Sequence, residues 1–203
     1  AEGTRGTEAL QEQQVMATTL AEHIVGKLIA ASVVEEADRE LYVYGFFLLI
    51  SRLFFFLVAA VFGCFLGIPW ESVIFYIVFI LLRSYAGGVH AKTEKARTGW
   101  TTLAMGIAVA AIKTLEASNG KALPLLIFSN LCLLLFTPLD SKEKPLDAEE
   151  KRRYRKICLW LLLICDAAVA AAYFLKLPML YYPVICGMCL EAILLSIGKM
   201  SDM

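Results

Sequence analysis

A glycine-rich break that carries a histidine interrupts an apolar part of the chain. The segment RSYAGGVHA, residues 83–91, follows an apolar run and precedes a cluster of charged residues. Gly87 and Gly88 allow backbone conformations that other residues avoid, so the chain can turn sharply there. His90 has the side chain best suited to moving a proton near neutral pH. The pattern is compatible with acid–base chemistry at this segment, and equally with a loop histidine that has no chemical role.

The cysteines do not supply a nucleophile beside this histidine. The chain has six of them, at Cys64, Cys132, Cys158, Cys165, Cys186 and Cys189. All lie in or beside apolar runs and none has zinc-like spacing with histidine, so we expect small buried hydrophobic residues. The sequence shows no HExxH zinc motif, GxSxG elbow or nucleotide-binding glycine loop. We therefore expect no metal and no organic cofactor.

The residues around the histidine resemble a known family, AgrB, the membrane endopeptidases of Gram-positive peptide quorum sensing. Six residues of the segment RSYAGGVHA carry this resemblance: Arg83, Ala86, Gly87, Gly88, His90 and Ala91. The segment KEKPLDAEEKRRYRKI, residues 142–157, is similar to the family's basic cytoplasmic loop. The hydropathy pattern from about Met16 onward also resembles that of the family.

The resemblance implies a cysteine endopeptidase in which Arg83, Gly87 and Gly88 shape the site around His90. A cysteine thiolate would attack a peptide carbonyl, with His90 as its base and then as the acid for the leaving amine. A thiol or hydroxyl within the bound peptide would displace the enzyme from the resulting thioester and close a thiolactone or lactone ring. The implied partner is an AgrD-like signalling propeptide with an amphipathic N-terminal segment and an acidic C-terminal tail.

The nucleophilic cysteine that the family places about seven residues after the histidine is missing. The position seven residues after His90 is Arg97, and the position six residues after it is Ala96. An inactivated variant with alanine in place of cysteine would put the nucleophile at Ala96, which is the interpretation we favour. The ungapped count puts it at Arg97, and a natural relative without peptidase activity is the third interpretation. We expect the chain as written to bind a propeptide without cleaving it.

Two other classes of function compete with the peptidase: a small peptide transporter or exporter, and a non-catalytic membrane adaptor. A transporter should carry several ionisable groups near the bilayer midplane. Only Arg52 and Asp166 qualify, and we expect these two to pair, although Asp166 could instead make an interhelical hydrogen bond. Glu191 is expected at the inner membrane interface. The absent cysteine keeps the adaptor as a third alternative.

Long apolar blocks predict the elements that must position these residues. The chain is 59% hydrophobic with a mean hydropathy of +0.68, and blocks of this kind are typical of a protein in a bilayer. We expect an all-α polytopic integral membrane protein with about six transmembrane helices in one membrane domain, residues 16–203. The expected spans are residues 41–67, 71–85, 100–115, 122–139, 157–175 and 178–198.

The N-terminal part of the chain differs from these spans. Residues 17–38 predict an amphipathic helix, in the membrane interface or packed on the protein. Residues 1–15 are expected to be a tail or an expression remnant, without a signal peptide.

The distribution of cations predicts an orientation. Lysine and arginine concentrate in residues 141–156 and in the charged cluster after His90, so both segments are expected in the cytoplasm. Six spans then place both termini in the cytoplasm of a multi-pass cell-membrane protein. The basic segment could bind the propeptide or anionic lipid headgroups, and the zero net charge gives no indication of a nucleic-acid partner. The small residues AAVAAA, 167–172, would allow close helix packing and a homodimer.

Overall fold

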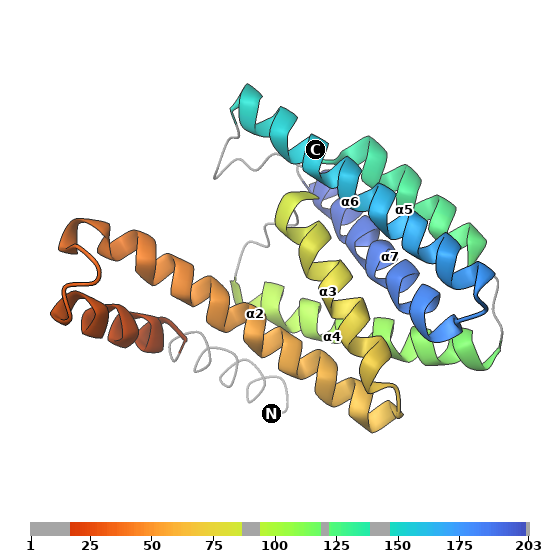
Figure 1. Ribbon diagram of the computed structural model, residues 1–203, viewed down its shortest axis with the longest axis horizontal. Coiled ribbons are helices and arrows are strands. Elements are labelled where there is room, and N and C mark those ends of the chain that lie inside the picture. Colours follow the sequence, from red (N-terminus) through yellow and green to blue (C-terminus); the bar gives the residue numbers. More distant parts are fainter. Residues whose placement is uncertain (1–16, 87–93, 119–121, 139–146, 202–203) are drawn as a thin grey trace.

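The chain is built of helices. The computed structural model describes residues 17–86, 94–118, 122–138 and 147–201, and these ranges contain helices and no strand. Residues 17–30 form a first helix. The elements that follow are η1 (Glu36–Asp38), α2 (Arg39–Leu66), α3 (Pro69–Ala86), α4 (Glu94–Ala117), α5 (Leu123–Phe136), α6 (Ala148–Phe174) and α7 (Pro178–Ser201). The expected all-α fold is confirmed, and each expected span corresponds to one of the helices α2–α7 (Figure 1).

The helices differ in how well they suit a bilayer. In the described residues, four segments are long and apolar enough to cross a membrane: Glu36–Leu66, Pro69–Ala86, Ala148–Phe174 and Pro178–Lys199. α5 is apolar, but its 14 residues rise only about 21 Å, less than a hydrocarbon core of about 30 Å. α4 is longer and carries polar residues, among them Thr101, Thr102 and Lys113. The protein is a helical membrane protein, and among the described helices α4 and α5 do not meet the length and hydropathy expected of a span.

Helix α7 is the centre of the bundle. It contacts α3, α4, α5 and α6, and every residue from Tyr182 to Ala192 is buried. A helix that is covered on all its faces must lie inside a bundle rather than on its surface. Helices α3, α4, α5 and α6 therefore pack around α7, and α3 among them leads to the predicted site (Figure 1).

A glycine allows α3 and α7 to approach closely. A Cβ atom at Gly187 would lie 3.1 Å from the carbonyl oxygen of Phe75 and 3.1 Å from Cγ1 of Val78. Small residues at such points let two helix backbones come together within a membrane protein. Further along α3, Leu82 and Ala86 are fully buried in the cluster that includes α7. The last turn of α3 is thus packed into the core.

Helix α2 lies at the edge of the bundle. It packs on α3 and α4, and only Ala59 and Gly63 are buried along its 28 residues. Gly67, with φ of 74°, ends α2 in the left-handed conformation and turns the chain into α3. The helix at residues 17–30 has a buried face formed by Ala21 and Val25, whereas Leu20 is exposed.

Helix α6 begins earlier than its apolar sequence indicates. Residues 148–156, which we expected in a loop, form its first turns. Asp147 caps the helix and makes a capping box with Glu150, and Glu149 and Glu150 place negative charge in the first turn. Both features stabilise a helix N-terminus because they satisfy free N–H groups and oppose the helix dipole. The charged segment is therefore a helical extension of the span.

Candidate functional site at the end of helix α3

The predicted motif runs from the end of one helix to the start of another. α3 ends at Ala86 and α4 begins at Glu94. Arg83 lies in the last turn of α3. Pro69 and Glu71 at the start of α3 suit a helix N-terminus, and the pair of glycines after Ala86 disfavours its continuation. The structure thus provides the two helix ends that hold the motif.

Three predicted site residues, Gly87, Gly88 and His90, lie outside the described residues. The two candidate nucleophile positions, Ala96 and Arg97, belong to the start of α4, where the backbone is helical and the side chains are not among those described. The roles predicted for these five residues stay predictions.

Three consecutive residues attach the last turn of α3 to three other helices. Arg83 forms an ion pair with Glu191 of α7. The hydroxyl of Ser84 accepts a hydrogen bond of 3.2 Å from Nη2 of Arg52 in α2. The ring of Tyr85 packs edge-on against Tyr154 of α6, with 6.2 Å between the ring centroids. Because successive helical residues point about 100° apart, one turn can reach three neighbours.

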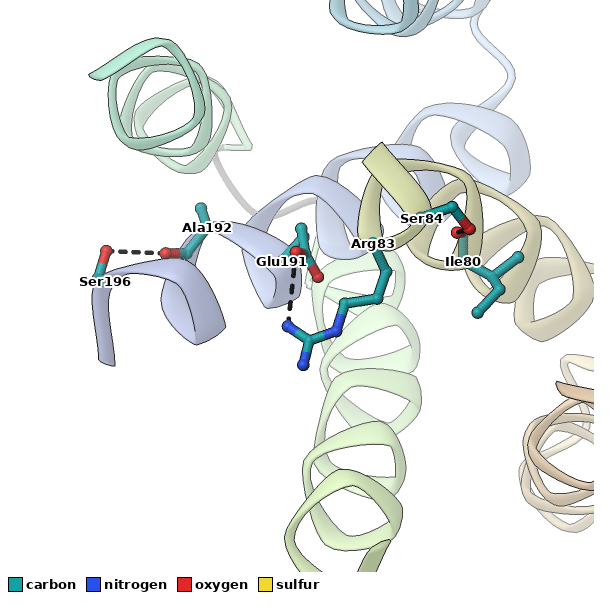
Figure 2. Close-up of polar contacts among 6 residues, drawn as sticks. All are labelled: Ile80, Arg83, Ser84, Glu191, Ala192 and Ser196. Atoms are coloured by element: carbon teal, nitrogen blue, oxygen red, sulfur yellow. Dashed lines mark hydrogen bonds and ion pairs between the residues drawn. The ribbon is translucent and has the colours of Figure 1, made fainter. Parts of the chain in front are cut away.

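The ion pair of Arg83 and Glu191 is the most buried of these three contacts. Nη1 of Arg83 lies 3.6 Å from Oε1 of Glu191 (Figure 2). The Glu191 side chain is 0% exposed and that of Arg83 is 23% exposed. Neither carboxylate oxygen of Glu191 makes a hydrogen bond with the described residues. A buried carboxylate is costly unless a cation compensates it, so removal of Arg83 from this place would leave Glu191 without the compensation that the structure shows.

Glu191 therefore lies inside the bundle, covered by other helices. Its expected depth, at the inner membrane interface, stays a prediction. The fully buried Met188, Ala192 and Leu195 surround it along α7. Sequence reasoning missed this role because the carboxylate stands alone in an apolar run.

The expected pair of Arg52 and Asp166 is not formed. Arg52 is bonded to Ser84, and the carbonyl of Arg52 accepts a hydrogen bond of 2.5 Å from the hydroxyl of Tyr76. Asp166 accepts a hydrogen bond of 2.8 Å from Nδ2 of Asn130 in α5. The reason is architectural, since α2 packs on α3 and α4 whereas α6 packs on α3 and α7. The alternative for Asp166, an interhelical hydrogen bond, is what the structure shows.

The start of α6 adds positive charge beside the end of α3. Its first turns carry five cations, Lys151, Arg152, Arg153, Arg155 and Lys156, and the last four of these are exposed. The contact between Tyr85 and Tyr154 joins this basic segment to the last turn of α3. An anionic group of a substrate or a lipid would be attracted to this end of the bundle.

The cysteines are distributed over the apolar helices, and Cys132 and Cys158 belong to the buried cluster that also contains Leu82 and Ala86 of α3. Cys132, Cys158, Cys186 and Cys189 are buried, Cys165 is partly buried and Cys64 is exposed, and none is in a disulfide. The buried environment we expected thus applies to most of them and not to Cys64. In the described ranges, no group of three histidine, cysteine, aspartate or glutamate side chains is arranged to hold a metal ion.

The sequence matches the family Accessory gene regulator B, AgrB, over residues 20–195. It is 26% identical over 144 residues to AgrB-like protein 2 of Clostridium perfringens strain 13. The aligned residues make up 65% of this chain and 67% of that protein. An AgrB-like protein of Clostridium perfringens strain SM101 is 25% identical over 144 residues, with the same coverage. No solved structure matches the chain. Since the family match includes most of the chain and all the helices around the ion pair of Arg83 and Glu191, this protein is a member of the AgrB family.

Proposed function

We propose that this protein takes part in quorum sensing by processing an AgrD-like propeptide as a membrane cysteine endopeptidase, with an altered nucleophile position in the chain as written. The observation that carries the proposal is the AgrB match over residues 20–195. The segment RSYAGGVHA, which begins in the last turn of α3, contains His90, the proposed base and acid of the reaction. Processing of a signalling propeptide is the role that membership of the family supports.

The proposed reaction begins with a cysteine thiolate near the start of α4. His90 takes the proton of the thiol, and the sulfur attacks the peptide carbonyl carbon. The carbon–nitrogen bond then breaks, and the protonated His90 gives its proton to the leaving amine. A thioester joins the N-terminal part of the propeptide to the enzyme. An internal thiol or hydroxyl of the peptide attacks this carbonyl, closes the ring and frees the enzyme thiol.

The start of α4 is a favourable place for such a thiolate. A helix N-terminus and neighbouring cations both lower the pKa of a thiol. Positions 96 and 97 fall in the first turns of α4, next to Lys95 in the sequence. In this chain the two positions hold alanine and arginine, which cannot form a thioester. We infer that the chain as written binds the propeptide without cleaving it.

The basic start of α6 suits the acidic tail of the proposed propeptide. Four exposed cations lie there, and the ring contact of Tyr85 and Tyr154 keeps them beside the motif. Attraction at this end would align the peptide so that its cleavage point meets His90. The same cations support the proposal that this end of the bundle faces the cytoplasm, and we propose a cytoplasmic location for both termini as well. A homodimer through the small residues 167–172 is also part of the proposal, since four of these six residues are exposed on α6.

Restoring the nucleophile tests the proposal. Ala96→Cys and Arg97→Cys are made separately, and each is incubated in lipid nanodiscs with a synthetic propeptide that has an internal cysteine. We expect one of the two variants to release the C-terminal fragment and to form a hydroxylamine-sensitive adduct detected by mass spectrometry. Adding His90→Ala to the active variant should slow product formation by about 10²–10⁴-fold, the usual contribution of a general base.

The outcome also distinguishes the second candidate function, a non-catalytic adaptor, which the alanine and arginine at positions 96 and 97 favour. Binding of the propeptide by both restored variants, without any cleaved or covalent product, would identify the adaptor. A failure of the chain as written and of both variants to bind the propeptide would exclude the processing role.

A further inference from the structure

We propose that the outward face of the first turns of α6 binds the headgroup of an anionic phospholipid. Arg152, Arg153 and Lys156 form this face, and the acyl chains of the lipid lie along Trp160 and Leu163 of the same helix. The ligand is a glycerophospholipid with a net negative charge, such as phosphatidylglycerol. The inference concerns the chain as written, and it does not rest on the proposed peptidase activity.

The first support is the side of α6 on which the three cations lie. At about 100° per residue, Arg152, Arg153 and Lys156 fall within one arc of about 100° around the helix axis. The three are exposed. The buried residues of α6 lie on the opposite side: Cys158, Leu162, Val169 and Ala172. Tyr154 also lies on that opposite side, where its ring packs against Tyr85 of α3, so the cationic face is turned away from the bundle.

The second support is the apolar surface that continues the cationic face along α6. Trp160 follows Lys156 by one turn, Leu163 follows Trp160, and both fall within the same arc of the helix. Their side chains are 59% and 60% exposed in a segment that is apolar enough to cross a membrane, so they face acyl chains. Tryptophan is typical of the boundary between acyl chains and headgroups. Cations followed by apolar side chains match a phospholipid with a charged headgroup and apolar chains.

The third support is the depth of the cations in the bilayer. Phe174 ends α6 and lies 18 positions after Lys156, since 174 minus 156 is 18. These positions rise about 27 Å, close to the thickness of a hydrocarbon core of about 30 Å. Arg153 and Arg152 lie about 4.5 Å and about 6 Å farther along the helix, within a headgroup layer of about 5–8 Å. The face therefore meets the phosphates of one leaflet.

The positive charge of this face is not neutralised by the described residues. In the described ranges, no ion pair or side-chain hydrogen bond involves Arg152, Arg153 or Lys156. Glu149 lies on the same side of α6, but seven positions before Lys156 and thus about 10 Å farther from the hydrocarbon core. Cations at the level of the phosphates attract anionic lipids more than zwitterionic ones.

Two other cations of the same turns provide a matched control. Lys151 and Arg155 are four positions apart, as Arg152 and Lys156 are, but they lie on the side of the buried Leu162. The inference thus divides the basic segment into an outward pair that binds lipid and a pair on the side of the bundle. Removing either pair changes the net charge of the chain by the same amount.

The binding experiment uses the full chain in detergent micelles. Phosphatidylglycerol and phosphatidylcholine with the same acyl chains are added separately, and native mass spectrometry measures the bound lipid as a function of concentration. The parent chain is compared with the double variant Arg152→Gln, Lys156→Gln and with the control Lys151→Gln, Arg155→Gln.

We expect the parent to bind phosphatidylglycerol at least about 10-fold more tightly than phosphatidylcholine, because several cations act on one headgroup. The outward pair should lose most of this preference, and the control should keep it within about threefold. Equal affinity of the parent for the two lipids would overturn the inference. An equal loss of preference in the two double variants would do so too, since it would reflect net charge instead of a site.

A second measurement locates the lipid in a bilayer. Trp70→Phe with Trp100→Phe leaves Trp160 as the fluorophore, and the chain is placed in nanodiscs of phosphatidylglycerol and phosphatidylcholine in equal amounts. Bromine on the acyl chains of one lipid or the other quenches the tryptophans that it contacts. The control chain keeps Trp70, which is exposed at the start of α3 beside Glu71, and carries Trp100→Phe with Trp160→Phe.

We expect brominated phosphatidylglycerol to quench Trp160 at least about twofold more than brominated phosphatidylcholine, and Trp70 to show no such difference. The double variant Arg152→Gln, Lys156→Gln should abolish the difference at Trp160. Equal quenching of Trp160 by the two lipids in the parent would refute the inference. Unchanged lipid preference of the double variant, together with weaker binding of the propeptide, would assign this face to the peptide and refute it as well.

Discussion

The polar residues inside the spans form separate contacts, each of which joins a particular pair of helices. Arg52 joins α2 to α3, Arg83 joins α3 to α7, and Asp166 joins α6 to α5. A path for a transported substrate would instead gather ionisable groups at one depth. The described contacts therefore support assembly of the bundle more than transport through it.

A double-mutant cycle should distinguish the observed partner of Asp166 from the expected one. Replacing Asn130 and Asp166 by alanine, singly and together, should reveal a coupling of about 0.6–1.7 kcal/mol in the free energy of unfolding, the range for hydrogen bonds between membrane helices. The same cycle on Arg52 and Asp166 should be additive within about 0.5 kcal/mol, since they have no shared partner. The measurement is reversible unfolding in mixed micelles. Coupling between Arg52 and Asp166 that exceeds the coupling between Asn130 and Asp166 would contradict the structure.

Some features of the candidate site could be predicted from single residues and others could not. Arg83 and His90 stand out because charged and glycine-rich positions interrupt an apolar run. The partner of Arg83 could not be identified from sequence, since several charged residues lie in apolar segments and pairing depends on which helices become neighbours. The pairing of Arg52 with Asp166 was wrong for that reason.

At the scale of helices, a glycine decides how closely α2 approaches α3. A Cβ atom at Gly63 would lie 2.6 Å from Cβ of Ser72, a buried residue whose hydroxyl donates to the carbonyl of Pro69 at 2.8 Å. A Cβ atom at Gly45, in the same helix, would have no such neighbour within 4 Å. The two glycines thus differ in packing but share one helix.

We expect Gly63→Ala to lower stability by about 1–3 kcal/mol, because the added methyl group overpacks the contact with α3. Gly45→Ala should be neutral or raise stability by up to about 1 kcal/mol, since alanine is the better helix former. Unfolding in mixed micelles measures both. Equal effects of the two substitutions would show that the contact at Gly63 does not hold α2 against α3.

The apolar blocks were sufficient to predict that α2–α7 exist and in what order. They were insufficient for the start of α6, because residues 148–156 are charged and carry no apolar signal. The capping box of Asp147 and Glu150 was the sequence feature that could have located that start. The central position of α7 was also not predictable, since the sequence of an apolar helix shows the same pattern whether lipid or protein covers the helix.

At the scale of the whole molecule, the bundle has two ends that differ in charge. One end carries the last turn of α3 and the five cations at the start of α6, which the contact of Tyr85 with Tyr154 joins. The turn between α6 and α7, with Lys176, lies at the other end of α6. The excess of cations predicts that the first end faces the cytoplasm.

Labelling of intact cells tests this orientation. Glu149→Cys marks the start of α6, and Lys176→Cys marks the opposite end of the same helix. A membrane-impermeant maleimide added outside the cells should label Lys176→Cys at least about 10-fold faster than Glu149→Cys, and permeabilisation should remove the difference. The reverse preference would mean that the motif faces the outside, where the proposed propeptide would not reach it.

The place of α7 in the chain has a consequence for biosynthesis. The span on which its neighbours pack follows all of them in the sequence, so the earlier spans enter the bilayer before their common support exists. Arg83 precedes its countercharge by 108 residues, since 191 minus 83 is 108. At about 5–20 residues per second, the nascent helix waits roughly 5–20 s with an uncompensated guanidinium. The helix on which the others pack, α7, is thus synthesised after the helices that pack on it.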